Sequence, residues 1–230
     1  YKVRRIMRQQ GLKTTWTRAF IRTTDSSQKM KVADNVLDQQ FNPSEPNNAW
    51  AADMRSTASQ DIWTASGWLY LAAIIDLYSR KIVGYSLSNR MTADLVCTAL
   101  QIAIYARQPP KGLIMHTDRG SQYCSQQYKD LLSQHGMVCS MSHKGFTEQC
   151  SSYDNAVMER FFLNLKMERV WQQHYPNQQE AIKDISQYIT VFYNQVRLHS
   201  KLGYLSPEKH CFASLEQKNT IISMPVSDFT

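Results

Sequence analysis

The stretch Leu113–Tyr123, LIMHTDRGSQY, is the segment around which the predicted fold is organised. Its first three residues are apolar and begin a strand, and a polar turn containing Asp118 and Gly120 follows at once. In open α/β sheets, ligands bind at the carboxyl ends of the strands, and a glycine there allows close approach of backbone or ligand. An Asp in such a turn can also be an ordinary surface cap. The other acidic residues of the chain decide between these two interpretations.

The segments around this stretch predict a mixed sheet covered by helices. An apolar strand at 68–75 (WLYLAAII) and an alternating strand at 81–88 (KIVGYSLS) form a predicted hairpin. A helix with Thr92 as its N-cap follows and stops at Pro109. Further elements are predicted as a helix at 125–135, a strand at 137–141, helices from about 154 and over 178–197, and a short helix after Ser206. Paired strands followed by strands alternating with helices indicate an α/β domain of the ribonuclease H-like class.

Positive charge is concentrated at the beginning of the chain. The net charge is +7, and residues 1–40 hold nine Lys or Arg but only three acids. A basic arm before a near-neutral body favours binding to the phosphates of a nucleic acid, although a solvated tail is the alternative. Arg4, Arg5 and Arg8 lie on an amphipathic segment that fits the last helix of a partial helix-turn-helix. We therefore predict a basic nucleic-acid-binding arm and linker at 1–40, a globular core at 45–213 and a tail at 214–230.

Composition narrows the class of protein further. Hydrophobic residues make up 43% of the chain and charged residues 20%, which is typical of globular domains. The apolar runs are too short to span a bilayer, so no membrane partner is expected. Five cysteines without a C-x-x-C pair indicate reduced thiols and a cytoplasmic location. Because the chain opens at Tyr1 without an initiator Met, we expect a fragment or a processed product. Neither a zinc site nor an ATP-binding loop is indicated.

Three carboxylates form a candidate catalytic set. Asp53 ends the segment WAAD, Asp118 follows the strand described above, and Glu159 lies on the predicted helix YDNAVMERFFLNLK (153–166). Two acids on strands and one on a helix packed over them make an all-oxygen cluster suited to Mg²⁺ or Mn²⁺. Two such ions roughly 3.5–4 Å apart activate an attacking oxygen and stabilise the leaving oxygen of a phosphodiester. A Glu on a helix is more often simply solvated, so Glu159 needs the other two acids to support its assignment.

Six blocks carry a family resemblance: WAAD, GWLYLAAIIDLYSRKIVGYS, LIMHTDRGSQY, SMSHKG, YDNAVMERFFLNLK and FYNQVRLHSKLGYLSPE. Together they resemble the retroviral-integrase-like transposases of bacterial insertion sequences, in particular the orfB type, which is fused to a small upstream helix-turn-helix frame. The resemblance implies a DDE catalytic core that acts on the element's ends by cleavage and strand transfer. It also implies that Asp53, Asp118 and Glu159 are the catalytic and metal-binding residues, with two Mg²⁺ or Mn²⁺ ions.

The resemblance also implies supporting residues and partners. Lys166 and Arg119 match positions expected to contact DNA, while His116 and Asn155 match supporting positions. Asp76 matches a family position that is expected to be structural. The implied partners are element-end and target DNA, the upstream helix-turn-helix product and further copies of the chain on DNA. The implied location is the bacterial cytoplasm, in association with the nucleoid.

Two departures from the family pattern leave alternatives open. Apparent insertions occur at 55–61, just after Asp53, and at 146–152. The first makes Asp61 a rival to Asp53, and together they place 40 residues between Asp118 and Glu159, so that Asp154 rather than Glu159 has the usual spacing. An insertion within a strand requires a bulge to preserve the register of later residues. A DNA-binding remnant with impaired catalysis, and a purely hydrolytic ribonuclease H-like nuclease, therefore remain alternative functions.

Overall fold

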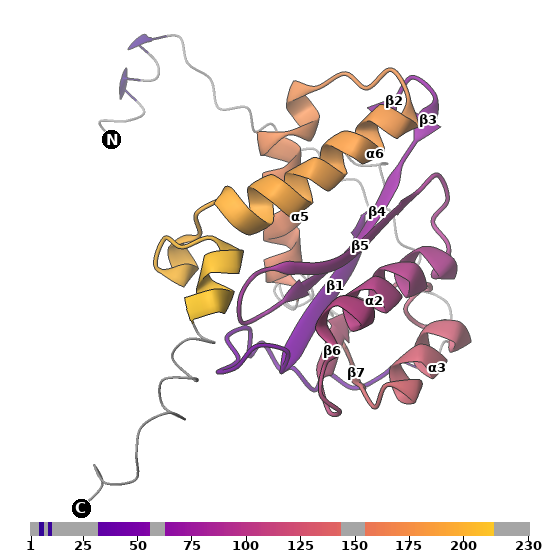
Figure 1. The fold of residues 1–230 in the computed structure, drawn as a ribbon. Helices are drawn as coiled ribbons and strands as arrows, with labels where there is room; N and C mark the ends of the chain where they lie inside the picture. The colour runs from indigo at the N-terminus through magenta and orange to yellow at the C-terminus, as the bar shows by residue number, and fades with distance from the viewer. Residues whose placement is uncertain (1–4, 7–8, 11–31, 56–62, 144–154, 214–230) are drawn as a thin grey trace, which may run out of the picture.

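The computed structural model describes residues 5–6, 9–10, 32–55, 63–143 and 155–213 (Figure 1). Within the arm, Arg5 is helical and exposed, whereas Arg4 and Arg8 lie outside the described residues, so the partial helix-turn-helix stays a prediction. Asp61 and Asp154 also lie outside them, as do the segment 146–152, the tail and all of the segment 55–61 except Arg55. The effect of the apparent insertions on activity therefore stays a prediction too.

The core contains a five-stranded mixed sheet, as predicted. Its strands are β1 (Ala49–Arg55), β4 (Tyr70–Asp76), β5 (Ile82–Ser88), β6 (Ile114–Thr117) and β7 (Val138–Met141), in the order β5-β4-β1-β6-β7. The predicted hairpin is confirmed, because β4 pairs antiparallel with both β5 and β1. Strands β6 and β7 run parallel to β1. The register between β1 and β4 is regular as far as Arg55.

The predicted strand at 68–75 is divided in the structure. Gly67–Trp68 forms β3, which pairs with β2 (Trp63–Thr64) in a separate two-stranded sheet. The main-sheet strand β4 begins only at Tyr70. A continuous apolar run cannot show where a strand changes its partner, because both parts have the same strand composition.

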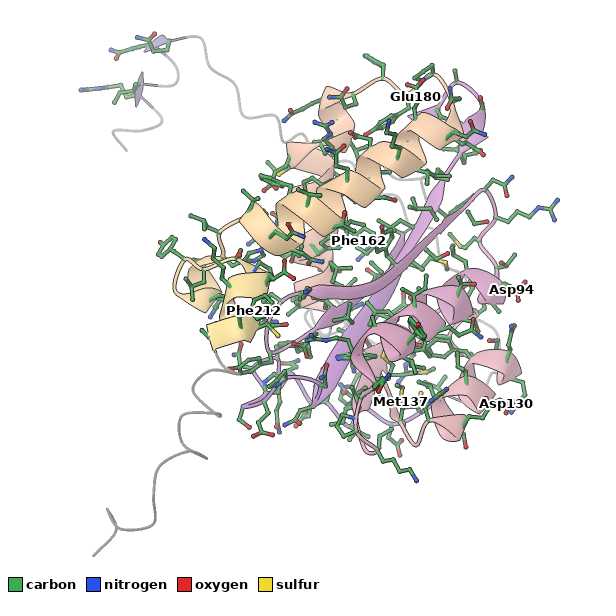
Figure 2. All side chains as sticks on the ribbon, in the orientation of Figure 1. Asp94, Asp130, Met137, Phe162, Glu180 and Phe212 are labelled. Carbon is green, nitrogen blue, oxygen red and sulfur yellow. The ribbon has the colours of Figure 1, made fainter. Side chains whose placement is uncertain are left out.

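Helices cover both faces of the sheet (Figure 1). Side chains alternate along a strand, so Trp50 and Ala52 of β1 pack with α2 (Ala93–Arg107) and α3 (Gln126–Gln134). Ala49 and Ala51 pack on the opposite face with α5 (Ala156–Glu168) and α6 (Gln178–Gln187). The second core also holds aromatic side chains of α5, among them Phe162 (Figure 2). Odd-numbered residues of β1 therefore face α5.

The helix ends differ in part from the predictions. Thr92 occupies the N-cap position of α2, but its side chain makes no capping hydrogen bond. Ser125 does cap α3, because its side chain accepts a hydrogen bond from the backbone N–H of Tyr128. The predicted helix at 178–197 is helical over 178–196, but its second half, Tyr188–Val196, is a π-helix. Apolar periodicity does not distinguish such a widened segment from an α-helix.

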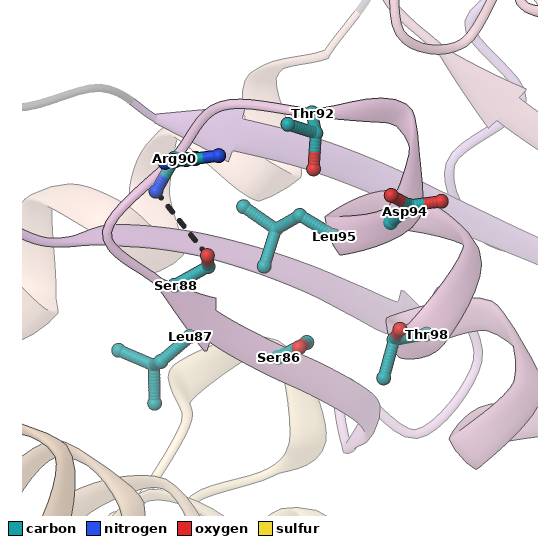
Figure 3. Close-up of a pocket in the computed structure, with 8 residues that line it drawn as sticks. All are labelled: Ser86, Leu87, Ser88, Arg90, Thr92, Asp94, Leu95 and Thr98. Atoms are coloured by element: carbon teal, nitrogen blue, oxygen red, sulfur yellow. Dashed lines mark hydrogen bonds between the residues drawn. The ribbon is translucent and has the colours of Figure 1, made fainter.

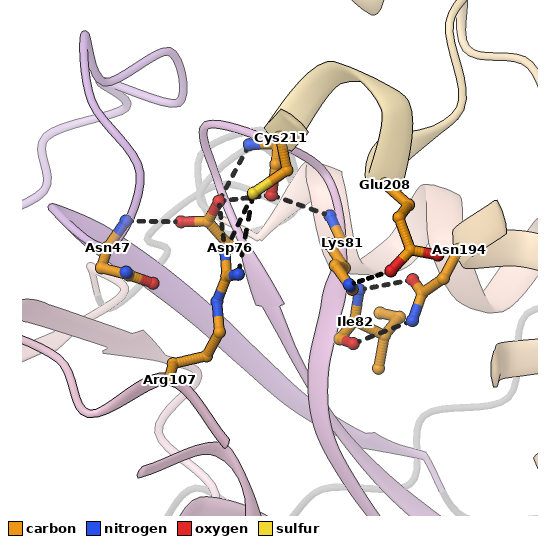
Figure 4. Close-up of polar contacts among 9 residues, drawn as sticks. Asn47, Asp76, Lys81, Ile82, Arg107, Asn194, Glu208 and Cys211 are labelled. Atoms are coloured by element: carbon orange, nitrogen blue, oxygen red, sulfur yellow. Dashed lines mark hydrogen bonds and ion pairs between the residues drawn. The ribbon is translucent and has the colours of Figure 1, made fainter. Parts of the chain in front are cut away.

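Asp76 is structural, as expected, and joins several elements (Figure 4). Its fully buried carboxylate accepts hydrogen bonds from the backbone N–H groups of Asn47 at 3.0 Å and Ser79 at 2.9 Å. Arg107 of α2 adds an ion pair at 3.9 Å. Nearby, Lys81 binds Glu208 at 2.7 Å, which holds the predicted last helix, residues 207–213, against the sheet. No helix in the described part of the chain is long and apolar enough to cross a membrane.

Candidate active site

The carboxyl ends of β1 and β6 bring the first two acids together. The parallel register pairs Ala51 with His116, and Asp53 and Asp118 each lie two residues further along. Neighbouring strands are about 4.8 Å apart, so this register places the two acids at the same level on adjacent strands. The carboxyl edge of an open sheet is where such folds bind ligands.

Asp53 lies under the start of α5. It is only 2% exposed and shares the α5-facing side of β1 with Ala49 and Ala51. Asn155, at the N-cap position of α5, makes no capping hydrogen bond, although Asn is a common N-cap residue. Its side-chain Nδ2 donates instead to the carbonyl of Ala52 at 3.2 Å, which ties the helix start to the strand beside Asp53.

Asp118 lies in the turn after β6, where its backbone neighbours fix its orientation. Its Oδ1 accepts a hydrogen bond from the N–H of Gly120 at 2.8 Å, and a Cβ on Gly120 would lie 2.9 Å from the same oxygen. Burial raises the pKa of Asp118 to about 6, and the nearby Asp53 carboxylate acts in the same direction. The Gly120 hydrogen bond and the charge of Arg55 oppose this rise without cancelling it. Asp118 is thus the acid of the set whose negative charge is least compensated.

Arg55 connects the first acid to the third. Its Nε donates to Asp53 at 2.7 Å, and its Nη2 donates to Glu159 on α5 at 3.3 Å. The negative charge of Asp53 has the largest effect on the pKa of Arg55 and raises it. Burial has the next largest effect and lowers this pKa, whereas the charge of Glu159 raises it. The net result is an Arg55 pKa above its usual range. Burial raises the pKa of Glu159, and Arg55 opposes that rise. Arg55 was missed by the sequence reasoning, although a strand places residues i and i+2 on one face.

The predicted supporting residues lie around the Asp118 turn and on α5. His116 is buried, with Nδ1 2.9 Å from the hydroxyl of Ser140 and Nε2 3.4 Å from that of Ser142. Arg119 donates through Nε to the carbonyl of Ser142 at 2.6 Å, so it also fixes this turn. Lys166 lies on α5 two turns after Glu159 and is partly exposed. DNA contacts by Arg119 and Lys166 stay predictions.

The chemistry of the site fits a hard divalent cation. The acids supply oxygen ligands, and one further buried oxygen at the start of α5, Asn155 Oδ1, has no hydrogen-bond partner. Within the described ranges, however, no three His, Cys, Asp or Glu side chains are arranged closely enough to hold a metal ion. The positive charge between Asp53 and Glu159 is that of the Arg55 guanidinium.

A separate groove of about 370 Å³ lies at the sheet edge formed by β5 and the start of α2 (Figure 3). It is lined mainly by polar side chains, including Ser86, Arg90 and Asp94. Strand β4 separates β5 from β1, so this groove is not part of the acid site.

Comparison with known proteins identifies the family. Two family models described as "Integrase core domain" match residues 43–146 and 142–207. The uncharacterized 31 kDa protein of insertion element IS600 from Shigella sonnei is 43% identical over 206 residues, which cover 90% of this chain and 72% of that protein. The transposase InsF of insertion sequence IS3A from Escherichia coli K12 is 42% identical over 203 residues, which cover 88% of this chain and 67% of that protein.

Solved structures show the same fold at low sequence identity. A chain of the simian T-cell lymphotropic virus intasome has a TM-score of 0.57 at 15% identity, over 81% of this chain and 60% of that one. The HTLV-2 integrase catalytic core, solved with magnesium, has a TM-score of 0.50 at 18% identity, over 71% of this chain and 95% of that one. The fold is therefore that of the ribonuclease H-like integrase cores. Within this class, the chain belongs to the insertion-sequence transposases related to InsF.

Proposed function

We propose that this transposase catalyses metal-dependent cleavage and strand transfer at insertion-sequence ends, with Asp53, Asp118 and Glu159 as its DDE residues. The observation that supports this assignment is the placement of Asp53 and Asp118 at the carboxyl ends of adjacent strands, together with the link from Asp53 through Arg55 to Glu159. Two Mg²⁺ or Mn²⁺ ions held there would supply activation of the attacking oxygen and stabilisation of the leaving oxygen.

The chain's own residues position this chemistry. Gly120 and His116 restrain the turn that carries Asp118, and Asn155 fixes the start of α5, on which Glu159 lies. Because the pKa of Asp118 is raised to about 6, its carboxyl still carries some proton just below neutral pH, and metal binding would release that proton. The attacking oxygen belongs to water in cleavage and to a DNA 3′-hydroxyl in strand transfer.

DNA binding is proposed along α5 and the basic arm. Lys166 projects from the same helix as Glu159, and Arg119 lies exposed beside Asp118. Arg4, Arg5 and Arg8 would neutralise backbone phosphates. The partners proposed are element-end and target duplexes, the upstream helix-turn-helix product and further copies of this chain on DNA, all in the bacterial cytoplasm. The relatives' intasome and transposase names support DNA and multimers as partners.

The test uses labelled duplexes that carry the element's ends, incubated with Mg²⁺ or Mn²⁺ and the wild type, D53N, D118N or E159Q. D130N is the matched control, because Asp130 is an exposed carboxylate on α3 (Figure 2). We expect nicked and joined products from the wild type and D130N and neither from the other three variants, with DNA binding retained by all.

The alternatives give different patterns in this assay. Binding without any cleavage by the wild type would indicate a catalytically impaired remnant. Cleavage without joined products would indicate a hydrolytic nuclease. Full activity of D53N would exclude Asp53 and make Asp61 the first acid.

A further inference from the structure

Arg55 lies between two of the acids proposed as metal ligands, where a positively charged side chain is unexpected. Its guanidinium forms a bridge with Asp53 on one side and Glu159 on the other, at 2.7 Å and 3.3 Å. These are two of the three acids assigned above to metal binding. Residues 55 and 159 are 104 positions apart, so only the packing of α5 on β1 brings the pair together.

Arg55 also lies between Asp53 and solvent. The side chain of Asp53 is 3% exposed, whereas those of Arg55 and Glu159 are each 41% exposed. The arginine is thus at the rim of the site, and Asp53 lies beneath it. The side chain of Arg55 is long and partly exposed. Its guanidinium can therefore move into solvent while its aliphatic part stays against the sheet.

We propose that Arg55 is a built-in counter-ion that holds Asp53 and Glu159 together in the metal-free protein and has to be displaced before a divalent cation can bind both. This inference rests on the proposed function, because it takes Asp53 and Glu159 as metal ligands. The guanidinium and the divalent cation compete for the same two carboxylates. The arginine therefore weakens metal binding by the free energy of the bridge, and in return it offsets the repulsion between the acids when no metal is bound.

The contact partners distinguish this role from that of a simple surface ion pair. An exposed pair between one Arg and one acid contributes little. Here the same guanidinium donates to two carboxylates through different nitrogens, and one of these carboxylates is buried. Charge-assisted hydrogen bonds to a buried carboxylate are stronger than those on the surface. A measurable penalty on metal binding is therefore expected.

The test is a calorimetric titration of Mn²⁺ into metal-free wild type, R55Q, R55K, D118N and R90Q, without DNA. R90Q makes the same charge change at an exposed arginine beside β5, away from the acids. We expect R55Q to bind Mn²⁺ about tenfold more tightly than the wild type, equivalent to about 1.4 kcal/mol. R55K is expected to lie between the two, because Lys keeps the charge but not the two-armed geometry. R90Q is expected to match the wild type.

The melting temperature is a second measurement of the Arg55 bridge and does not depend on catalytic activity. In EDTA, R55Q should melt at a lower temperature than the wild type, because the acids lose their counter-ion. Saturating Mn²⁺ should remove that difference, because the wild type then also lacks the bridge. Should R55Q fail to fold, R55K carries the comparison in both measurements.

Two outcomes would overturn the proposal, and they can be told apart. If Mn²⁺ binds the wild type and not D118N, but R55Q binds no more tightly than the wild type, the displacement model is wrong while the metal-dependent function stands. If neither the wild type nor R55Q binds Mn²⁺ in a way that D118N abolishes, both the displacement model and the metal-dependent function are wrong.

Discussion

Replacing Asp118 by Asn is expected to stabilise the metal-free protein at alkaline pH while abolishing strand transfer. The pKa of Asp118 is raised from 3.8 to about 6, mainly by burial, so the folded state disfavours its charged form. Asn keeps an oxygen that can accept the hydrogen bond of the Gly120 N–H but carries no charge. A catalytic acid that costs stability is a common feature of active sites.

The magnitude follows from the size of the pKa shift. A shift of about two pKa units corresponds to about 3 kcal/mol at about 1.4 kcal/mol per unit. Asp118 is only half-buried, so solvent screening reduces the expected gain to about 1–3 kcal/mol. Between about pH 4 and 6 the folded state binds more protons than the unfolded state, so wild-type stability falls as the pH rises through this window. The advantage of D118N should therefore be complete above pH 7 and absent near pH 4.

Urea unfolding in EDTA at pH 8 and at pH 4.5 measures this difference. The control D130N should change stability by less than about 0.5 kcal/mol at both pH values, because Asp130 is exposed. D53N should instead lower the free energy of unfolding by about 1–2 kcal/mol at pH 8, because Arg55 loses its 2.7 Å ion-pair partner. This prediction would be refuted if D118N were less stable than the wild type at pH 8. It would also be refuted if D118N exceeded the stability of the wild type by the same amount at both pH values.

Two further predictions concern the scaffold. G84A should lower the free energy of unfolding by about 1–3 kcal/mol in urea titrations, because the added Cβ would collide with the carbonyl oxygen of Ala99 on α2; an unchanged midpoint would contradict this packing. Burial, followed by the charge of Arg197, lowers the pKa of His199 to about 4. As the pH falls, His199 is therefore protonated in the unfolded state before it is protonated in the folded state. The free energy of unfolding of the wild type should fall by about 1–3 kcal/mol as the pH drops from 6.5 to 4. H199F keeps a ring against Tyr193 and should show a flatter pH profile; equal profiles would show that another group titrates.

The sequence predicted most of the fold because its signals are local. The apolar runs of β4 and β6 are direct consequences of burial on both faces of the sheet, and the run of β6 places Asp118 at the end of a strand without any knowledge of tertiary contacts.

The features that the sequence could not predict are choices among partners. Asn155 is of a residue type that commonly caps helices, but its side chain donates a hydrogen bond to the carbonyl of Ala52 on β1 instead. Residues 188–196 have the periodicity of an α-helix but form a π-helix, in which Asn194 exchanges two hydrogen bonds with Ile82 on the edge strand β5. In both cases a side chain hydrogen-bonds to a strand that is far away in the sequence, and local patterns do not specify such a partner.

The charges of the acid site are compensated unequally, and this inequality has a consequence for metal binding. Arg55 pairs directly with Asp53 and Glu159, whereas Asp118 has only a more distant effect from that arginine and a backbone N–H. A divalent cation bound to Asp118 would therefore neutralise the least compensated carboxylate of the set without breaking the ion pairs of Arg55. Contact with Asp53 and Glu159 requires the bridge to open. On the proposed assignment of the three acids, Asp118 would therefore hold the cation before Asp53 and Glu159, because binding by those two would require the Arg55 bridge to open.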